Sequence, residues 1–193
     1  MGELQTKADG AASARRVIVV LSGLPGTGKT SLGQALAAEV GGTYFSFGRF
    51  VRSLADTAGK PRDRPTLQSL GDALVADDAR TFVDRAMATI EGTNTALIID
   101  GVRHLTVLDV LESRAQQNGE LLLLIHLTAP QSLRLERLAA RGTSSTDALT
   151  AEQHPSEHDV VQGLPQRALF CFDTESELQE TLSAIRAKLA ELA

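Results

Sequence analysis

The chain has 193 residues, of which 42% are hydrophobic and 22% are charged, and these values are ordinary for one soluble globular domain. The formal net charge is −5, and no run of lysine or arginine exceeds the Arg15-Arg16 pair, which argues against binding of duplex nucleic acid through its phosphates. Aromatic residues make up only 4% and tryptophan is absent, so an aromatic platform for single strands is not expected either.

Cysteine content and hydropathy narrow the class of protein further. Cys171 is the only cysteine, which excludes an intrachain disulfide, and its apolar surroundings predict a buried, inert thiol. No apolar run approaches the length of a membrane span, and the segment before Arg15 does not have the pattern of a signal peptide. We therefore expect a cytoplasmic protein without a membrane partner, either a monomer or a homodimer. Residues 1–14 are expected to form a flexible arm, and residues 15–193 a single domain.

Strand and helix patterns alternate along the whole domain. Strands are expected at residues 17–21, 43–47, 96–100, 121–127 and 168–172. Helices are expected at residues 29–40, 50–58, 67–91, 106–117, 131–140 and 175–192. This alternation predicts an α/β fold, in which a five-stranded parallel sheet carries helices on both faces. Residues 142–164 are the least regular stretch, and a loop of that length is usually functional or disordered.

The first chemical motif lies between the first strand and the first helix. Residues 23–30 read GLPGTGKT and match the pattern G-x-x-x-x-G-K-[ST] without exception. Glycines allow the backbone to approach a polyphosphate closely, and the amides at the start of the following helix favour negative charge. An accidental glycine loop is the alternative, but the apolar strand before the motif and the helical spacing after it argue against that. The motif predicts binding of a nucleoside triphosphate.

Two residues of this motif have specific chemical roles. Lys29 is expected to reach the β- and γ-phosphates as a mobile point charge. Thr30 is expected to place its hydroxyl on Mg²⁺, which prefers oxygen ligands. The residues expected to bind ATP are Gly23, Leu24, Pro25, Gly26, Thr27, Gly28, Lys29, Thr30 and Ser31.

A second feature follows the third strand. The apolar run 96–99 ends in Asp100, and an acidic residue at that place commonly holds Mg²⁺ beside a phosphate loop. A turn or cap role for Asp100 is the alternative. Arg103 follows closely and is well placed to meet phosphates at the carboxyl end of the sheet, unless it pairs with a nearby carboxylate instead.

Arginines recur after several of the expected strands. Arg137 and Arg141 are four residues apart and can project from one side of a helix, where their guanidinium groups would match phosphate oxygens. Surface salt bridges are the alternative for each arginine taken singly. The further members of the set are Arg49, Arg52, Arg62, Arg64 and Arg134.

These features resemble the nucleoside monophosphate kinase group of P-loop kinases, and most of all the bacteriophage-type deoxynucleoside monophosphate kinases, with dephospho-CoA kinases as cousins. The resemblance covers most of residues 17–172, although only the phosphate loop is stringent. The stretches that carry it are the phosphate loop, the R-x-x-R-x-x-x-R series at residues 134–141, RPTLQSLG at 64–71, DGVR at 100–103 and HPSE at 154–157.

The resemblance implies a three-layer α/β/α P-loop kinase fold with a mobile lid at about residues 137–165, and Mg²⁺ with ATP as the phosphoryl donor. Small nucleotides would be its partners, and the loop after the last strand, with Asp173 and Thr174, would border the adenine of ATP. The implied catalytic residues are Lys29, Asp100, Arg103, Arg137 and Arg141, with Thr30 and Asp100 holding the metal. The implied acceptor-binding residues are Arg49, Arg64, Gln68 and Arg103, with Gln68 as a candidate reader of the acceptor base.

The sequence differs from that of dephospho-CoA kinases just after the second strand. Dephospho-CoA kinases tend to carry an Asp there, whereas this chain has Ser46-Phe47-Gly48 and no general base. A phosphate acceptor is already a nucleophilic oxyanion, whereas a hydroxyl acceptor has a greater need of a general base. The absence of the Asp therefore favours a (deoxy)nucleoside monophosphate as the acceptor. A kinase of a hydroxyl acceptor, such as a sugar, a nucleoside, dephospho-CoA or a polynucleotide end, remains open. So does a nucleotide-binding regulatory module without turnover.

The HPSE stretch admits two interpretations. Ser156 with Asp159 three residues later predicts a helix capping box after Pro155. Contact of His154 or Glu157 with the substrate is the other interpretation. His126 lies on an expected strand and is interpreted as a core or edge residue rather than a metal ligand.

Overall fold

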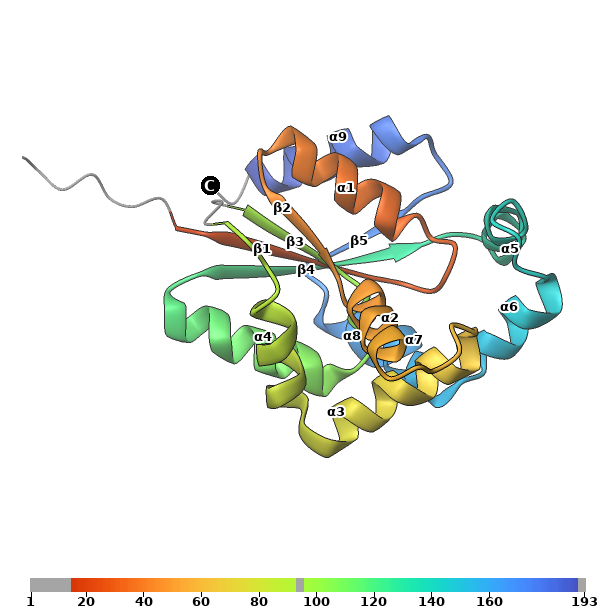
Figure 1. Ribbon diagram of the computed structural model, residues 1–193. Coiled ribbons are helices and arrows are strands. Elements are labelled where there is room, and N and C mark those ends of the chain that lie inside the picture. Colours follow the sequence, from red (N-terminus) through yellow and green to blue (C-terminus); the bar gives the residue numbers. More distant parts are fainter. Residues whose placement is uncertain (1–14, 93–95, 191–193) are drawn as a thin grey trace, which may run out of the picture.

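The computed structural model describes residues 15–92 and 96–190, and these residues form a parallel sheet between two layers of helices (Figure 1). The five strands are ordered β2-β3-β1-β4-β5, and all neighbouring pairs are parallel. They are β1 (Val17–Ser22), β2 (Thr43–Ser46), β3 (Ala96–Asp100), β4 (Leu121–Thr128) and β5 (Phe170–Asp173). The predicted α/β fold is therefore confirmed. The expected arm, residues 1–14, lies outside the described residues.

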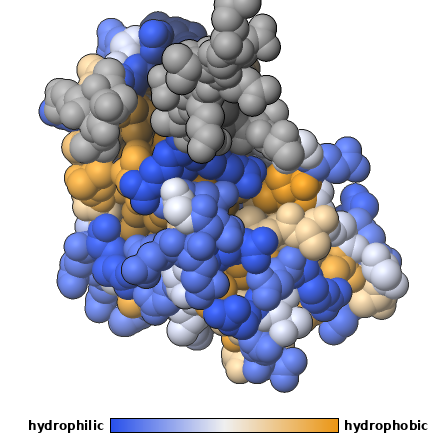
Figure 2. Space-filling model, turned by 90° about the vertical axis from the view of Figure 1, so that its left-hand side faces the viewer, coloured by the Kyte–Doolittle hydropathy of each residue, from blue (hydrophilic) through white to orange (hydrophobic). Residues whose placement is uncertain are grey.

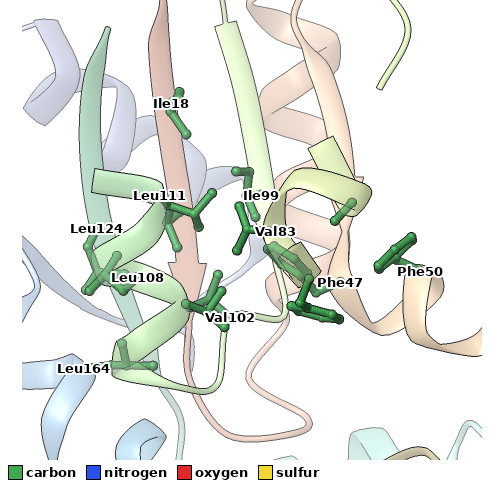
Figure 3. Packing of buried hydrophobic residues seen from close by; sticks show 14 of the residues in the cluster. Ile18, Phe47, Phe50, Val83, Ile99, Val102, Leu108, Leu111, Leu124 and Leu164 are labelled. Carbon is green, nitrogen blue, oxygen red and sulfur yellow. The ribbon is translucent and has the colours of Figure 1, made fainter. Parts of the chain in front are cut away.

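The central strands are hydrophobic because helices cover both of their faces. One face packs against α1 (Lys29–Glu39) and α9 (Leu178–Ala190), around Leu32, Leu36 and Leu182. The other face packs against α2 (Phe47–Thr57), α3 (Arg64–Met87) and α4 (Leu105–Asn118). Figure 3 shows this second core, in which Leu108 and Leu111 of α4 lie over β1 and β4.

The strand register gathers the chemical residues at one edge of the sheet. Leu21, at the end of β1, pairs with Asp100 of β3, and Ser46 of β2 pairs with the same aspartate. Ser22 pairs with His126 of β4, whose Nδ1 lies 2.8 Å from the serine hydroxyl, so His126 is a buried residue with a partner. The carboxyl ends of β1 and β3 therefore present the phosphate loop and Asp100 side by side.

The expected irregular stretch 142–164 is mostly helical, so that expectation was wrong. It contains α6 (Ser145–Glu152), the 3₁₀ turn η1 (Pro155–Glu157), α7 (His158–Val161) and the start of α8 (Gly163–Arg167). These helices are short, and a hydrophobic period cannot be recognised over so few residues. Val160 and Leu164 are buried in the same core as α4, so the second half of the expected lid belongs to the body of the domain.

Three smaller differences have local causes. Cys171 is exposed rather than buried, because β5 is an edge strand and only its alternate residues, Phe170 and Phe172, are partly covered. The long helix α3 is kinked at Asp78, whose backbone is not helical. The last strand begins two residues later than expected, at Phe170. After Pro130, α5 (Gln131–Ala139) agrees with the sequence to within one residue.

The described helices and the surface opposite the phosphate loop carry mainly hydrophilic side chains or only short apolar runs. None of the helices within residues 15–92 and 96–190 is long and apolar enough to cross a membrane. Figure 2 views the molecule from the left-hand side of Figure 1, where β1 begins, and this face carries mainly hydrophilic side chains with smaller hydrophobic groups between them. The phosphate loop lies at the other end of β1, so the candidate site opens away from that face.

Candidate functional site

The phosphate loop, residues 23–30, has the backbone that its glycines predict. Gly23, Gly26 and Gly28 all have positive φ, a conformation that other residues adopt only with strain. A Cβ atom at Gly26 would lie 2.6 Å from the carbonyl oxygen of Arg134 on α5, so only glycine fits between loop and helix. The helix α5 therefore packs directly against one side of the loop. On the other side of the loop sequence, α1 begins with Lys29.

The ammonium group of Lys29 lies against the loop. Its Nζ donates to the carbonyl oxygen of Gly23 at 2.6 Å, to that of Leu24 at 2.9 Å and to Thr27 Oγ1 at 3.3 Å. Burial lowers the pKa of Lys29 from 10.5 to about 8, although the nearby charge of Asp100 acts in the opposite direction. A triphosphate tail would offer this ammonium group a stronger partner than neutral carbonyl oxygens.

Binding of Mg·ATP is expected to weaken above pH 8, because Lys29 then loses the proton that makes it a cation. Bound phosphates favour the protonated ammonium, so each further pH unit should raise Kd by up to about tenfold. Calorimetric titrations from about pH 7 to about pH 9 would measure this dependence. Lys29→Arg, which keeps its charge throughout that range, is the matched control and should show a flat profile. An equally flat profile for the wild type would contradict the role given to Lys29.

Asp100 gathers the groups that could hold a magnesium ion. Its Oδ2 accepts hydrogen bonds from Thr30 Oγ1 at 2.8 Å and from the hydroxyl of Tyr44 at 2.9 Å. Burial raises the pKa of Tyr44 to about 12, and the charge of Asp100 adds to the shift, so this hydroxyl stays a donor. Asp100 itself is only 5% exposed.

This donor set fits Mg²⁺. The ion is usually held by one or two carboxylates together with substrate phosphates and water, and Thr30 and Asp100 offer a hydroxyl and a carboxylate at one place. Within the described part of the chain, no three His, Cys, Asp or Glu side chains are grouped so that they could hold a metal without such help. No sequence motif marks Tyr44, which belongs to β2 and reaches Asp100 because β2 pairs with β3 in the sheet.

A small cavity of about 250 Å³ adjoins the other side of the phosphate loop. Arg137 and Arg141 both line it, although α5 ends at Ala139 and Arg141 lies beyond the helix. Arg137 donates to the carbonyl oxygens of Gly26 and Thr174, at 3.3 and 2.6 Å, and thus joins the loop to the end of β5. The other lining residues are Thr27, Gly28, Ser31, Leu32, Thr174, Ser176, Leu178 and Thr181.

Thr174, rather than Asp173, is the residue after β5 that lines this cavity. Its hydroxyl is buried and donates to Thr27 O and Thr128 O, both at 3.0 Å. Asp173 is exposed and accepts a hydrogen bond from the backbone amide of Glu175, which stabilises the turn after the strand. The loop Asp173-Thr174 was expected beside the adenine of ATP, and within it the structure places Thr174 on the cavity wall.

The larger cavity, of about 670 Å³, lies between α2, α3 and the segment after β3. Arg64, Gln68 and Arg103, three of the four implied acceptor residues, line it together with Arg52 and Arg62. Arg49 does not line it, because its guanidinium group lies 4.9 Å from the centre of the Tyr44 ring. The apolar part of the wall is formed by Phe47, Val51, Leu67, Val75, Phe82, Val102 and Val107.

A buried carboxylate joins two of these arginines. Glu157 is 1% exposed, and its Oε1 is paired with Arg103 Nη1 and lies 3.6 Å from Arg64 Nη2. Burial lowers the pKa of Arg64 from its usual value, and repulsion by Arg103 acts in the same direction. The charges of Arg64, Arg103 and Glu157 also act on the pKa of Lys29, so the cluster lies within electrostatic reach of the phosphate loop.

The predicted capping box at Ser156 was wrong. His154 is the residue before the 3₁₀ turn, and its ring nitrogen accepts from the backbone amide of Ser156 at 3.4 Å. Asp159 instead accepts a hydrogen bond from the amide of Leu105, so it caps the start of α4. His154 Nδ1 also lies 3.5 Å from Asp72 of α3, and both side chains line the larger cavity.

Comparison with known proteins agrees with this geometry. A family model described as AAA domain matches residues 19–162. A cytidylate kinase of Ignicoccus hospitalis is 32% identical over 161 residues, which cover 82% of this chain and 83% of that protein. A gluconokinase from Sinorhizobium meliloti 1021 superimposes with a TM-score of 0.59 at 20% identity, over 93% of this chain and 95% of that one. A shikimate kinase from Acinetobacter baumannii, in complex with shikimate, has a TM-score of 0.61 at 13% identity, with coverages of 92% and 94%. The two structures share the fold.

Proposed function

This chain belongs to the AAA domain family and is a P-loop kinase, and on that basis we propose that it transfers the γ-phosphoryl group of ATP to the phosphate of a (deoxy)nucleoside monophosphate. That it is a phosphotransferase follows from its kinase relatives. The acceptor is the part that we propose, with a cytidine nucleotide as the first candidate because several relatives are cytidylate kinases.

One observation carries the proposal: Arg64 and Arg103 line a cavity beside the phosphate loop and lie close enough to Lys29 to influence its pKa. Two guanidinium groups at one end of a cavity match the oxygens of a phosphate monoester. The apolar wall of the same cavity suits a nucleobase, and a volume of about 670 Å³ has room for a mononucleotide. An acceptor held in this way would direct its phosphate toward the γ-phosphoryl group.

In this proposal, transfer depends on positioning and charge neutralisation. Lys29 leaves the loop carbonyl oxygens and neutralises the β- and γ-phosphates, while the backbone amides at the start of α1 bind them. Magnesium bound by Thr30 and Asp100 would neutralise further charge on the transferred group. Arg103 and Arg64 hold the acceptor phosphate, whose oxygen attacks the γ-phosphorus while ADP departs.

The surroundings of β2 support a phosphate acceptor over a hydroxyl acceptor. Ser46 occupies the place where a catalytic Asp would be expected, and its hydroxyl caps α2 by accepting from the amide of Arg49. Asp100 is engaged by Thr30 and Tyr44 and suits a magnesium ligand better than a proton acceptor. A phosphate oxygen needs no base, because it is already anionic.

A panel of acceptors tests the proposal. Purified protein with Mg·ATP is expected to release ADP with at least one nucleoside monophosphate, and cytidine and deoxycytidine monophosphate should be assayed first. The same panel should contain hydroxyl compounds, namely shikimate, gluconate, a nucleoside and dephospho-CoA. ADP release with a hydroxyl compound alone would overturn the proposed acceptor. No release with any compound, despite ATP binding, would instead indicate a regulatory module. Comparing ribose and deoxyribose forms would test the resemblance to bacteriophage-type deoxynucleoside monophosphate kinases.

A further inference from the structure

Glu157 is a charged side chain for which the proposed transfer chemistry has no direct use. Its Oε1 is paired with Arg103 and lies 3.6 Å from Arg64, and it also accepts from Gln68 Nε2 at 3.4 Å. Gln68 is itself buried and donates to the backbone carbonyl of Ala151 in α6 as well. The two hydrogen bonds that the Gln68 amide donates thus go to Ala151 and Glu157, within the expected lid, residues 137–165.

The position of Glu157 is fixed by the core. Val160, three residues later, is 1% exposed, and Leu164 is fully buried near Leu108 and Val102 (Figure 3). Asp159, which lies between Glu157 and Val160, accepts a hydrogen bond from the amide of Leu105 at the start of α4 at 2.8 Å. The backbone that carries this carboxylate is thus held by the core, and the carboxylate itself is buried. We therefore treat it as a resident partner of the arginines.

Arg64 retains hydrogen-bond donors that no described protein atom satisfies. Among the described residues, Arg64 Nε and Nη2 are buried atoms without a hydrogen-bond partner, since the distance to Glu157 exceeds that of a hydrogen bond. Buried donors of this kind are costly unless a ligand satisfies them. The side chains of Arg64 and Arg103 remain 28% and 34% exposed, and both residues line the cavity.

We propose that Glu157 is a positioning residue, which orients Arg103 and Arg64 so that their remaining donors bind the phosphate of the acceptor. This inference rests on the proposed function, because it assigns the anion to the acceptor side of the site. It also gives Gln68 a different role from base reading, since its amide helps to hold Glu157 in place. Glu157 itself would not touch the substrate, because its charge would repel a phosphate.

The test is a double-mutant cycle between Glu157→Gln and Arg103→Ala. The substitution by glutamine keeps the size of the side chain and removes its charge. It is expected to weaken acceptor binding by about tenfold or more, because charge-assisted hydrogen bonds are the stronger kind. Affinity for Mg·ATP should change little. In the Arg103→Ala background, Glu157→Gln should cause a clearly smaller loss of acceptor binding, because only Arg64 then remains to be oriented, whereas a purely structural role predicts an equal loss.

Binding should be measured by calorimetry, with the phosphate loop filled by magnesium and a non-hydrolysable ATP analogue. The probes are cytidine monophosphate and inorganic phosphate, so the result does not depend on turnover. Glu112→Gln is the matched control, because Glu112 forms a partly exposed ion pair with Arg167 away from the site. Thermal unfolding should verify that each variant is folded. Glu157→Asp, which retains the charge, should recover part of the affinity.

The outcomes separate this inference from the proposed function. Unchanged acceptor binding in Glu157→Gln would overturn the inference, and so would an equal loss in the presence and absence of Arg103. Failure of the wild type to bind either probe would overturn it as well. Binding that follows the expected cycle, without transfer to any nucleoside monophosphate, would support the positioning role and refute the proposed function.

Discussion

Replacing Lys29 with alanine is expected to lower kcat/KM for phosphoryl transfer by about 10³-fold, which corresponds to about 4 kcal/mol of transition-state stabilisation. The ammonium group lies within 2.6–3.3 Å of three loop oxygens, so it is already placed at the site where a triphosphate would lie. Its removal takes away the mobile charge that follows the γ-phosphoryl group during transfer. Steady-state rates at saturating acceptor would measure the loss.

The control for this substitution is Lys60→Ala, which removes an exposed lysine in the loop before α3. That variant should retain the rate of the wild type. If Lys29→Ala retained it too, the phosphate loop would not be the donor site, whatever its backbone conformation. Because Lys29 bonds loop carbonyls, thermal unfolding of the variant should be compared with that of the wild type, so that loss of structure is distinguished from loss of chemistry.

Replacing Asp100 with asparagine is expected to lower turnover by about 10²- to 10³-fold and to raise the magnesium concentration needed for half-maximal rate. The carboxylate is buried at the end of β3 and accepts from Thr30 and Tyr44. Asparagine keeps the shape and can still accept these hydrogen bonds, but it lacks the charge that a hard cation prefers. Magnesium titrations of the steady-state rate would measure both effects.

Asp84→Asn is the control for Asp100, because Asp84 is exposed and pairs with Arg114 far from the phosphate loop. It should leave the magnesium dependence unchanged. An Asp100→Asn protein with the same magnesium dependence as the wild type would show that the ion is held elsewhere. The hydroxyl of Tyr44 offers a second check, because Tyr44→Phe removes one donor to the carboxylate and retains its charge.

Local sequence patterns were sufficient to predict the sheet and the position and backbone conformation of the phosphate loop. The run VIVVL before the loop is hydrophobic on both sides, which only a buried parallel strand explains, and the structure places β1 in the centre of the sheet. The phosphate loop has a fixed spacing and three glycines with positive φ, and such a motif is readable without any long-range information. The position of Asp100 at the end of a strand beside β1 followed from the same patterns, because strand and motif together predict where it must lie.

The proposed acceptor side is formed by contacts between residues that are far apart in the sequence, so local patterns could not predict it. Glu157 meets Arg103, 54 residues away, and nothing in the HPSE stretch distinguishes a buried partner from a capping residue. Arg137 is predicted to bind phosphates. In the structure its guanidinium group donates to the hydroxyl of Thr174, which is 37 residues later in the sequence. The helices of residues 145–167 are too short to show a hydrophobic period, and their burial becomes apparent only when α4 and the core are in place.

The fate of the γ-phosphoryl group is the most direct test of the proposed reaction. ATP labelled radioactively at its γ-phosphate would be incubated with magnesium, the protein and cytidine monophosphate, and the products separated by chromatography. Our account predicts that the label appears as the β-phosphate of a nucleoside diphosphate, and that Lys29→Ala abolishes its appearance. Label that stays on ATP, or that leaves only as inorganic phosphate with every nucleoside monophosphate tested, would contradict it.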